Sequence, residues 1–236
     1  MEIAKEIDLL HELPPPRTFY KRAGKRIVDF TAALLMLLVL SPLLLLILVA
    51  LVLFQGGNPF FLQERIGRRC LPFNIIKFRT MTNATDAEGK LLPDEERTTW
   101  VGKFLRASSL DELPELINVL LGDMSFIGPR PWIPEQMATF DTSTRRYRMR
   151  IRPGISGLAQ VHGRNNLTFR QRVAHDLRYA RKLSPWLDLQ ILFLTFYKVA
   201  LHDGIAQRPD ALAAAPKDPE TKGLRGNKPR QYKKES

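Results

Sequence analysis

The apolar run from Phe30 to Phe54 constrains the fold of this chain more than any other feature. Leu, Ile, Val and Ala make up almost all of the run, and no charged residue occurs between Phe30 and Leu62. A run of this length is a candidate membrane segment. It is longer than the apolar region of a signal peptide, and no small-residue cleavage site follows it, so a cleaved leader fits poorly. We therefore expect a membrane-associated protein.

Ser41 and Pro42 divide the run near its middle. Proline removes the amide donor that would bond the Leu38 carbonyl and bends the helix, while the Ser41 hydroxyl can turn back to a carbonyl one turn earlier. Each arm, Phe30 to Leu40 and Leu43 to Phe54, covers about 17 Å, roughly half of a ~30 Å hydrocarbon core. These lengths favour a re-entrant helix-break-helix that enters and leaves by the same membrane face. The alternative is a spanning helix with a tolerated kink.

Positive charge occurs on both sides of the run, within a formal net charge of +12. The near flank carries Arg17, Lys21, Arg22, Lys25 and Arg26, and the far flank carries Arg65, Arg68 and Arg69. Cationic flanks prefer the cytoplasm, which supports a run whose two ends lie on the same side. Such basicity fits either nucleic acid or an anionic membrane surface. Because the chain shows no zinc-ligand spacing and no RNP-type aromatic motif, we expect anionic membrane lipids as partners and no nucleic acid.

These features divide the chain into four parts and indicate an α+β fold class. We expect a basic N-terminal lead-in at 1–26, a re-entrant membrane helix at 27–54, a folded domain at 55–207 and a basic, disordered tail at 208–236. The folded domain should combine interfacial helices with a small β-hairpin. The single cysteine, Cys70, excludes an internal disulfide framework and argues for a reducing compartment.

A β-hairpin is predicted directly after the membrane segment. Alternating apolar and polar residues predict strands from Phe60 to Ile66 and from Phe73 to Phe78, with turn residues at Gly67 and Pro72. Lys77 and Arg79 alternate with apolar residues, so on a strand their side chains would share one face. The polar, acidic residues 82–98 are typical of a surface loop.

The rest of the folded domain alternates helices with turn-rich segments. Apolar residues at helical spacing predict a helix from Leu110 to Leu120, with Gly122 as its stop. Two prolines flank Arg130 and stiffen the backbone that presents its guanidinium. The sequence RRYRMRIR at 145–152 could lie against a membrane surface. We expect a glycine-rich loop at 153–166, a polar helix at 169–181 and an interfacial or core helix at 185–201.

Asp111 and Glu112 form an adjacent acidic pair at the start of the predicted helix, and three interpretations of the pair compete. In a capping box, Ser109 and Glu112 would each accept from a backbone amide at the helix N-terminus. In a second structural register, Pro114 is the first helical residue and both acids lie just outside a helix end that favours negative charge. The third interpretation is a carboxylate nucleophile beside a metal ligand.

The order of the motifs resembles one family. KRIVDF, an apolar run broken by SP, KFRTM, LRASSLDELPEL, GDMSFIGPRP, PGISGLAQV and PWLDLQIL follow one another over residues 25–202. This series resembles the bacterial sugar transferase family, the monotopic polyprenyl-phosphate phosphoglycosyl transferases. The chain resembles the small form that holds the catalytic core alone.

The resemblance implies both the reaction and the roles of the site residues. A sugar 1-phosphate would pass from a UDP-sugar to a polyprenyl (undecaprenyl) phosphate, with release of UMP. Asp111 would be the nucleophile and Glu112 would hold Mg²⁺. Phosphates or nucleotide would be contacted by Lys77, Arg79, Arg106 and Arg130. Phosphoryl transfer depends mostly on positioning and charge stabilisation, so a nucleophile, a divalent metal and several cations make physical sense together.

The resemblance also implies a cellular place, the bacterial inner (cytoplasmic) membrane with the active site on the cytoplasmic face. The reaction would be the first membrane step of exopolysaccharide, O-antigen or glycoprotein glycan synthesis, with downstream glycosyltransferases as further partners. Two alternatives stay open. One is a glycosyltransferase that releases UDP, and the other is a non-catalytic, basic, membrane-anchored scaffold. No sugar-contacting residue can be identified from the sequence.

Overall fold

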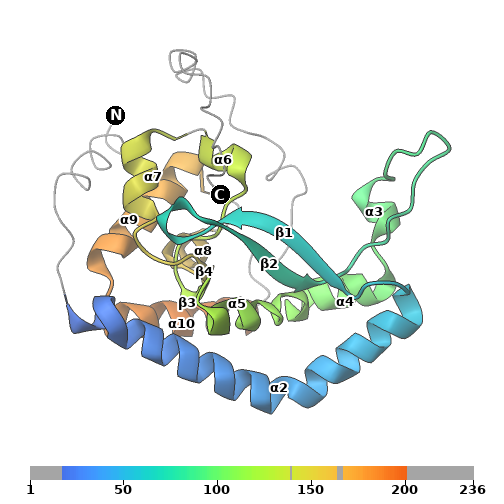
Figure 1. Cartoon of the computed structure of the whole chain (residues 1–236), viewed down its shortest axis with the longest axis horizontal. Helices are drawn as coiled ribbons and strands as arrows, with labels where there is room; N and C mark the ends of the chain where they lie inside the picture. Colours follow the sequence, from blue (N-terminus) through green and yellow to red (C-terminus); the bar gives the residue numbers. More distant parts are fainter. Residues whose placement is uncertain (1–17, 139, 164–166, 201–236) are drawn as a thin grey trace, which may run out of the picture. The chain divides into compact units, whose positions relative to one another are not determined.

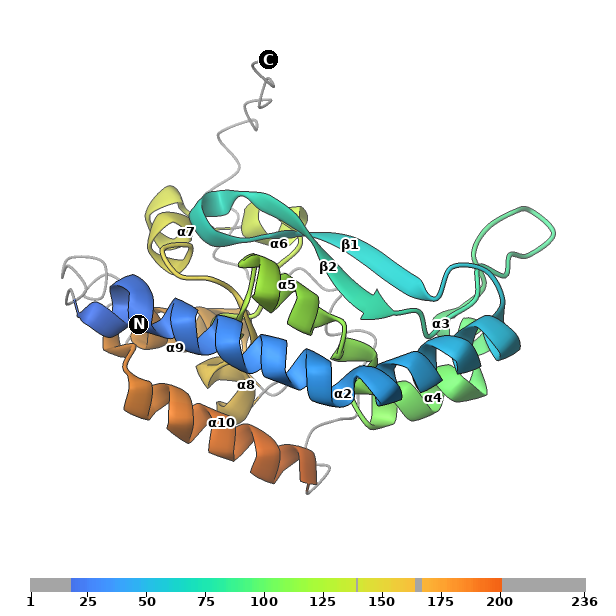
Figure 2. The same cartoon turned by 60° about the horizontal axis from the view of Figure 1, so that its bottom comes forward.

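The computed structural model describes residues 18–138, 140–163 and 167–200. The apolar run lies in a single helix, α2 (Lys25–Gln55), which follows a π-helical turn, η1 (Tyr20–Gly24). The helix continues through Pro42, so the predicted break is wrong and is replaced by the bend visible in Figures 1 and 2. The Ser41 hydroxyl donates to the Leu38 carbonyl at 2.8 Å. Because Pro42 has no amide hydrogen for this carbonyl, the hydroxyl replaces the missing bond and the helix stays continuous.

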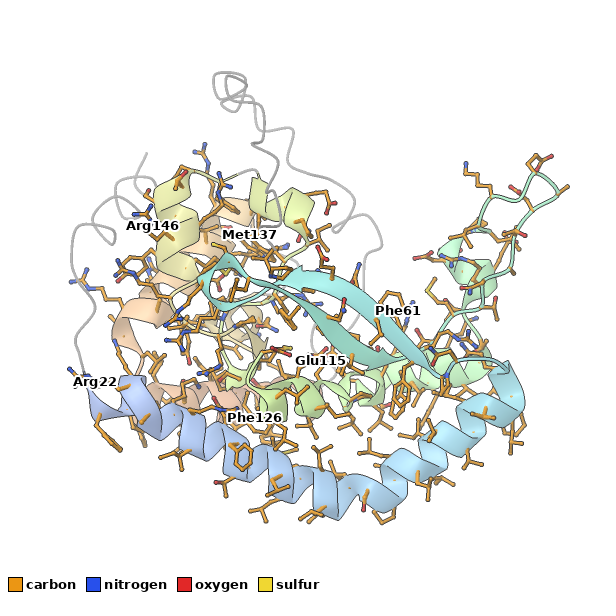
Figure 3. The ribbon with its side chains drawn as sticks, in the orientation of Figure 1. Arg22, Phe61, Glu115, Phe126, Met137 and Arg146 are labelled. Atoms are coloured by element: carbon orange, nitrogen blue, oxygen red, sulfur yellow. The ribbon has the colours of Figure 1, made fainter. Side chains whose placement is uncertain are left out.

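Most side chains of α2 face away from the rest of the chain, and Figure 3 shows them along the outer side of the helix. Only Asp29, Ala33, Ile47 and Leu51 of this helix are buried. Within the described residues, the segment Tyr20–Gln55 is the one helix long and apolar enough to cross a membrane, judged by length and composition. The exposed apolar surface therefore fits a membrane environment.

The predicted hairpin is confirmed. Strand β1 (Phe60–Ile66) pairs antiparallel with β2 (Pro72–Phe78), with Phe61 opposite Lys77. Between the strands lie Gly67 and a short 3₁₀ turn, η2 (Arg68–Cys70). In Figure 1 the hairpin crosses above α5 (Glu115–Leu121), the helix that follows the acidic pair in the sequence.

Two short helices follow the hairpin. Residues 82–98 are mostly loop, as predicted, but the loop ends in the helical turn α3 (Asp94–Arg97). Helix α4 (Trp100–Ala107) begins at Thr99, whose side chain accepts from the Gly102 amide. A Cβ atom at Gly102 would lie 2.0 Å from the Thr80 carbonyl oxygen. Glycine is therefore required here because the helix touches the backbone that leaves β2.

Helix α5 is held on both sides. On one side, the Asn118 side chain accepts from the Ile76 amide at 3.0 Å and donates to the Asn74 carbonyl at 2.8 Å, which fixes α5 to β2. On the other side, the Arg26 guanidinium of α2 donates to the Val119 and Leu120 carbonyls at 2.6 and 2.7 Å. A cation at a helix C-terminus satisfies orphan carbonyls and complements the helix dipole. The predicted stop at Gly122 is confirmed, with φ of 96°.

A small parallel sheet lies beyond α5. Strand β3 (Ser125–Ile127) pairs with β4 (Gly154–Ser156), and the connection carries α6 (Pro134–Ala138) and α7 (Thr142–Arg148). The prediction of a loop over 153–166 is wrong, because β4 and α8 (Leu158–His162) occupy most of it. A Cβ atom at Gly154 would lie 2.1 Å from the Gly128 amide nitrogen. The glycines in this segment allow backbones to approach closely, which composition alone does not distinguish from flexibility.

Two longer helices complete the described chain. Helix α9 (Phe169–Lys182) starts with a capping box between Thr168 and Gln171, and α10 (Pro185–Ala200) follows after a short turn. Both helices agree with the prediction. Figures 1 and 2 show α10 running beside the N-terminal half of α2. One side of α10 is buried at Ile191, and the other exposes Trp186 and Phe193.

A polar cluster joins α2 to α10 and α9. Asp188 accepts from the Tyr20 hydroxyl, from Lys25 Nζ and from the Tyr179 hydroxyl, each at 2.6 Å. Tyr179 also lies 2.9 Å from the Ile127 carbonyl oxygen, so the cluster reaches β3. These charged hydrogen bonds fix the N-terminal end of α2 to α9 and α10.

The sequence suggests that the segment 145–152 could lie against a membrane surface. Arg148 does not, because it is buried in the core. Its side chain is 1% exposed and donates to Asp176 at 2.7 Å. The guanidinium also lies over the Trp132 ring, 3.7 Å from its centroid. A neighbouring cluster of stacked rings, Trp132, Phe140 and Phe169, packs in the same core.

The mixed α+β fold class is thus confirmed, with one long apolar helix near the N-terminus and two small sheets. Residues 1–17 of the expected lead-in and the expected tail at 208–236 lie outside the described residues.

Candidate active site

The acidic pair lies in a tight turn between two helices. Helix α4 ends at Ala107, Ser109 adopts a left-handed conformation with φ of 57°, and a 3₁₀ turn, η3 (Leu110–Glu112), carries both acids. Ser109 makes no side-chain cap, so the capping-box interpretation is wrong. Helix α5 starts one residue after Pro114, which places the pair just before a helix N-terminus, close to the second predicted register.

Lys77 of β2 binds the second acid of the pair. Its Nζ atom lies 2.6 Å from Glu112 Oε1 and 3.0 Å from Glu115 Oε1. Figure 3 shows Glu115 where α5 faces the hairpin. Glu115 is 3% exposed and the Lys77 side chain is 18% exposed, so this ion pair is largely shielded from water. A cation shared by two carboxylates holds both acids in place and fixes the turn against β2.

Burial raises the pKa of Asp111 to about 6, and the neighbouring Glu112 charge acts in the same direction. The charges of Lys77 and Arg106 oppose this rise. Asp111 is 9% exposed. A poorly solvated carboxylate with nearby cations is a stronger nucleophile and base than one in water, and such perturbed groups concentrate at functional sites.

Glu115 is a site residue that sequence reasoning missed. Burial and the Glu112 charge raise the pKa of its carboxyl group, against the attraction of Lys77. A signal was present in the sequence, because positions 112 and 115 are three residues apart and lie on one side of a helix.

Arg106 and Arg130 approach the site from two different elements. Arg106 extends from α4 and donates through Nε to the Thr80 hydroxyl at 2.8 Å. Arg130 belongs to the proline-flanked loop after β3, and its exposed side chain acts electrostatically on Lys77 and Glu115. The Arg130 carbonyl accepts from Arg148 Nη2 at 2.6 Å, so the buried arginine fixes the backbone that carries the exposed one.

Arg65 is the second residue that sequence reasoning missed, since it was assigned only to the charged flank of the membrane run. It lines a small polar cavity of about 20 Å³ together with Lys77, Glu112, Glu115 and Arg130. Burial and the charge of Arg130 lower the pKa of Arg65 to about 10. Its Nε atom is buried without a hydrogen-bond partner among the described residues. Arg65 Nη1 and Nη2 donate to the Pro131 carbonyl and to Gln63 Oε1, which leaves Nε as its unused donor. An unused donor beside a second, repelling cation favours a bound anion such as phosphate.

Arg79, predicted to share a face with Lys77, does not reach this cavity. It follows the last residue of β2 and its guanidinium donates to the Gly56 carbonyl, at the end of α2. The chain leaves the strand after Phe78, so the alternation that relates positions 77 and 79 ends there. Arg79 therefore stabilises the connection between α2 and the hairpin. Ser41 and Pro42 lie within α2 and not at this site.

The carboxylates of the site limit how a divalent metal could be coordinated. No group of three or more His, Cys, Asp or Glu side chains in the described residues is arranged to hold a metal ion. Mg²⁺ is commonly bound through one or two carboxylates, with substrate phosphates and water as the other ligands. The Glu112 carboxylate beside the polar cavity fits such a site, in which an anionic substrate supplies part of the coordination.

The fold and site together define a class, a membrane-associated protein whose buried carboxylate and surrounding cations suit a phosphate-bearing substrate. Comparison with known proteins is consistent with this class. The model of the family described as bacterial sugar transferase matches residues 20–202. The chain belongs to this family and is an enzyme, a phosphoglycosyl transferase, as the sequence resemblance predicted.

Three relatives illustrate the similarity. The chain is 43% identical over 183 residues to the uncharacterized sugar transferase EpsL of Bacillus subtilis, covering 78% of this chain and 90% of EpsL. It is 38% identical over 198 residues to the exopolysaccharide production protein ExoY of Rhizobium meliloti, covering 77% and 87%. It is 41% identical over 180 residues to the UDP-glucose:undecaprenyl-phosphate glucose-1-phosphate transferase of Caulobacter vibrioides, covering 72% and 67%.

Proposed function

We propose that the protein transfers a sugar 1-phosphate from a UDP-sugar to undecaprenyl phosphate and releases UMP. The observation that carries this proposal is the buried Asp111 carboxylate, whose pKa is raised to about 6 beside Lys77 and Arg106. The name of the Caulobacter relative supports the same substrates. The names of the EpsL and ExoY relatives support a role in sugar transfer and exopolysaccharide production.

In the first half-reaction, a carboxylate oxygen of Asp111 attacks the sugar-bearing phosphorus of the UDP-sugar. A carboxyl oxygen–phosphorus bond forms, the bond from that phosphorus to the UMP oxygen breaks, and UMP leaves with the electron pair. Arg65, Lys77 and Arg130 supply positive charge beside the phosphates. Their positions fit the need of phosphoryl transfer for charge stabilisation around the moving group.

In the second half-reaction, a phosphate oxygen of undecaprenyl phosphate attacks the same phosphorus. The carboxyl oxygen–phosphorus bond breaks, and the Asp111 carboxylate is regenerated as the lipid diphosphate sugar forms. Glu112 is the residue best placed to hold Mg²⁺, which would neutralise phosphate charge when bound. Lys77 keeps Glu112 oriented in both half-reactions through the 2.6 Å contact.

We also propose that α2 is re-entrant and that the active site faces the cytoplasm at the inner membrane. Three helices expose large apolar side chains: α2 at Leu38 and Leu53, α4 at Trp100 and Phe104, and α10 at Phe193. Surfaces of this kind suit insertion into one leaflet. Helix α2 contains Pro42 and is bent in Figure 1, which supports two short arms. The cations that flank α2 favour a cytoplasmic place for both ends.

A burst experiment tests the mechanism. Purified protein with Mg²⁺ and a UDP-sugar, but without lipid, should release about one UMP per active site and gain the mass of a sugar phosphate. Asp111→Asn keeps the side-chain size and should abolish the burst. Asp94→Asn makes the same change at an exposed position on α3 and should leave the burst intact. UMP release only in the presence of lipid would instead indicate direct transfer, and release of UDP would indicate a glycosyltransferase.

A labelling experiment tests the topology. Cys70 is exposed, so it is first replaced by serine. Single cysteines at Arg22 and Glu64, which are exposed on either side of α2, should both resist a membrane-impermeant thiol reagent in intact cells. Both should react after permeabilisation, which controls for accessibility. Labelling of one position alone from outside the cell would show that α2 spans the membrane, and labelling of both would refute a cytoplasmic place for its ends.

A further inference from the structure

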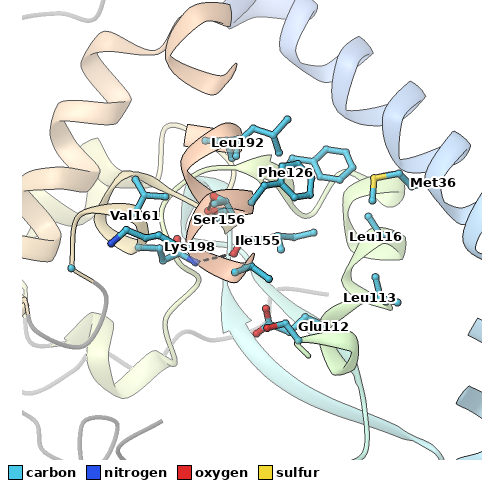
Figure 4. A pocket seen from close by; sticks show the side chains of 17 residues that line it. Met36, Glu112, Leu113, Leu116, Phe126, Ile155, Ser156, Val161, Leu192 and Lys198 are labelled. Carbon is cyan, nitrogen blue, oxygen red and sulfur yellow. Dashed lines mark hydrogen bonds between the residues drawn. The ribbon is translucent and has the colours of Figure 1, made fainter. Parts of the chain in front are cut away.

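A second, larger cavity also reaches Glu112. Its volume is about 310 Å³, and it is enclosed by residues of α2, η3, α5, both strands of the parallel sheet, α8 and α10. Figure 4 shows Met36 of α2, Leu116 of α5, Phe126 of β3 and Leu192 of α10 around it, with Glu112 at one end. The cavity shares Glu112 with the small polar cavity that contains Arg65 and Arg130. Glu112 therefore lies between two compartments of different chemistry.

The lining of the larger cavity is mostly apolar. The Thr195 hydroxyl donates to the Ile191 carbonyl at 2.7 Å and accepts from the Ser156 hydroxyl at 2.6 Å. The Gln160 amide donates to the Ile155 carbonyl at 2.8 Å, one of the bonds drawn in Figure 4, while its Oε1 atom is buried without a hydrogen-bond partner among the described residues. Lys198 is a further polar residue of the wall, so polar groups occur in the lining but are few beside the apolar ones. A sugar or a uracil ring would need several directed hydrogen-bond partners, whereas an apolar chain needs none.

The cavity adjoins the two helices that carry the longest exposed apolar surfaces. Met36 of α2 is 37% exposed, and Leu192 and Val199 of α10 are each 36% exposed, although all three line the cavity. These side chains thus belong to the cavity wall and to the membrane-facing surface at once. An apolar chain lying in the membrane can enter sideways between α2 and α10 without crossing water.

We propose that this cavity binds the isoprenyl units nearest the phosphate of the lipid acceptor and directs that phosphate toward Glu112. The inference rests on the proposed function, since it assigns a place to one of its two substrates. A volume of about 310 Å³ is at the lower end of the 300–1,000 Å³ usual for ligand pockets. The cavity therefore holds only the first few isoprenyl units, and the remaining chain lies along the apolar faces of α2 and α10.

Bulky substitutions on α10 test the proposal. Leu192→Trp places a larger side chain in the cavity wall, and Val199→Trp does so two turns later on the same helix face. Leu91→Trp is the control, because Leu91 is 52% exposed in the loop after β2, outside both α2 and α10, and does not line the cavity. Each cavity variant should raise the KM for undecaprenyl phosphate at least tenfold, while the lipid-independent UMP burst stays within twofold of the parent enzyme. The control should change neither quantity.

The same variants assayed with a two-isoprene prenyl phosphate locate the bound part of the chain. An equal loss with the short and the full-length acceptor supports binding of the phosphate-proximal units. A loss with the long acceptor alone, an increase in the KM for the UDP-sugar, or no effect from either cavity variant would overturn the proposal.

Direct cross-linking separates this inference from the proposed function. A prenyl phosphate with a photoreactive diazirine in its first isoprenyl unit should label residues of the cavity wall, such as Met36, Leu192 and Val199, in the full-length protein. Labelling should occur in Asp111→Asn as well, because it requires binding and no chemistry. Labelling confined to residues outside the cavity would refute the assignment even if the burst confirms the mechanism. Labelling inside it would support the assignment even if the burst fails.

Discussion

Replacement of Arg148 by methionine should destabilise the protein and weaken binding of the nucleotide sugar. Arg148 is fully enclosed, pairs with Asp176 at 2.7 Å, lies over the Trp132 ring and donates to the Arg130 carbonyl at 2.6 Å. Methionine fills a similar volume but leaves the buried Asp176 carboxylate without its main partner. The backbone of the Arg130 loop loses its anchor at the same time.

The size of the effect follows from these contacts. Breaking a buried ion pair from one side costs about 3–5 kcal/mol, because an uncompensated charge stays in the core. Arg172 also attracts Asp176, so the lower value of about 3 kcal/mol is expected. For a domain of this size, this corresponds to a decrease in Tm of roughly 6–12 °C. The double variant Arg148→Met/Asp176→Leu removes both charges and should recover most of the loss.

Thermal unfolding of the purified protein in lipid nanodiscs measures the effect. Arg146→Met is the control, because Arg146 is exposed on the same helix and its loss should change Tm by less than about 2 °C. At a temperature where both forms are folded, Arg148→Met should raise the KM for the UDP-sugar, because the loop carrying Arg130 is less fixed. A Tm within about 2 °C of the parent protein, or a double variant less stable than both single variants, would refute the reasoning.

Five further predictions have defined outcomes. Single-turnover UMP release should decline about tenfold per pH unit below about 6, because Asp111 must be anionic to attack, and a profile flat from pH 5 to 8 would contradict this. The pKa of Asp111 is raised on folding to about 6, so the charged carboxylate destabilises the folded state above that pH. Asp111→Asn should therefore increase the free energy of unfolding at pH 8 by at most about 3 kcal/mol, measured as a higher Tm. Below pH 4 the variant should give no increase. Glu112→Gln should increase the Mg²⁺ concentration for half-maximal burst rate, measured by titration. Arg130→Met should raise the KM for the UDP-sugar at least tenfold, whereas Arg79→Met should lower Tm with little change in that KM. Pro42→Ala restores the amide donor to the Leu38 carbonyl and should increase labelling from outside the cell at one flank of α2.

Local patterns in the sequence were sufficient for the elements that depend on neighbouring residues. The alternation from Phe60 to Ile66 gave β1 with its observed bounds, and Gly122 ended α5 as expected. The Ser41 hydroxyl bonds back by one turn, as its place before proline predicted. Each of these features is determined by chain geometry within a few residues.

Features that depend on distant contacts could not be predicted in this way. The path of the Arg79 side chain is set by its bond to the Gly56 carbonyl at the end of α2. Arg148 is buried because its partner Asp176 lies on another helix. Gly154 in β4 and Gly157 just after it allow the backbone to approach Gly128 closely, although the local composition of this segment is that of a loop. In the site, the acidic pair and Lys77 came from motif order. Glu115 was recognised through its contact with Lys77, although its spacing from Glu112 was a signal in the sequence. Arg65 was recognised only when β1 and α5 were placed together.

The Asp188 cluster has a consequence for the order in which the protein forms during synthesis. Lys25 and its partner Asp188 are 163 residues apart, and Tyr20 is 168 residues from the same carboxylate. At about 5–20 residues per second, the ribosome needs roughly 8–33 s to reach Asp188 after it has made Lys25. Helix α2 is therefore complete well before its bonds to Asp188 can form. Any early folding or membrane insertion of α2 takes place without these bonds, which later connect an already formed helix to α9 and α10.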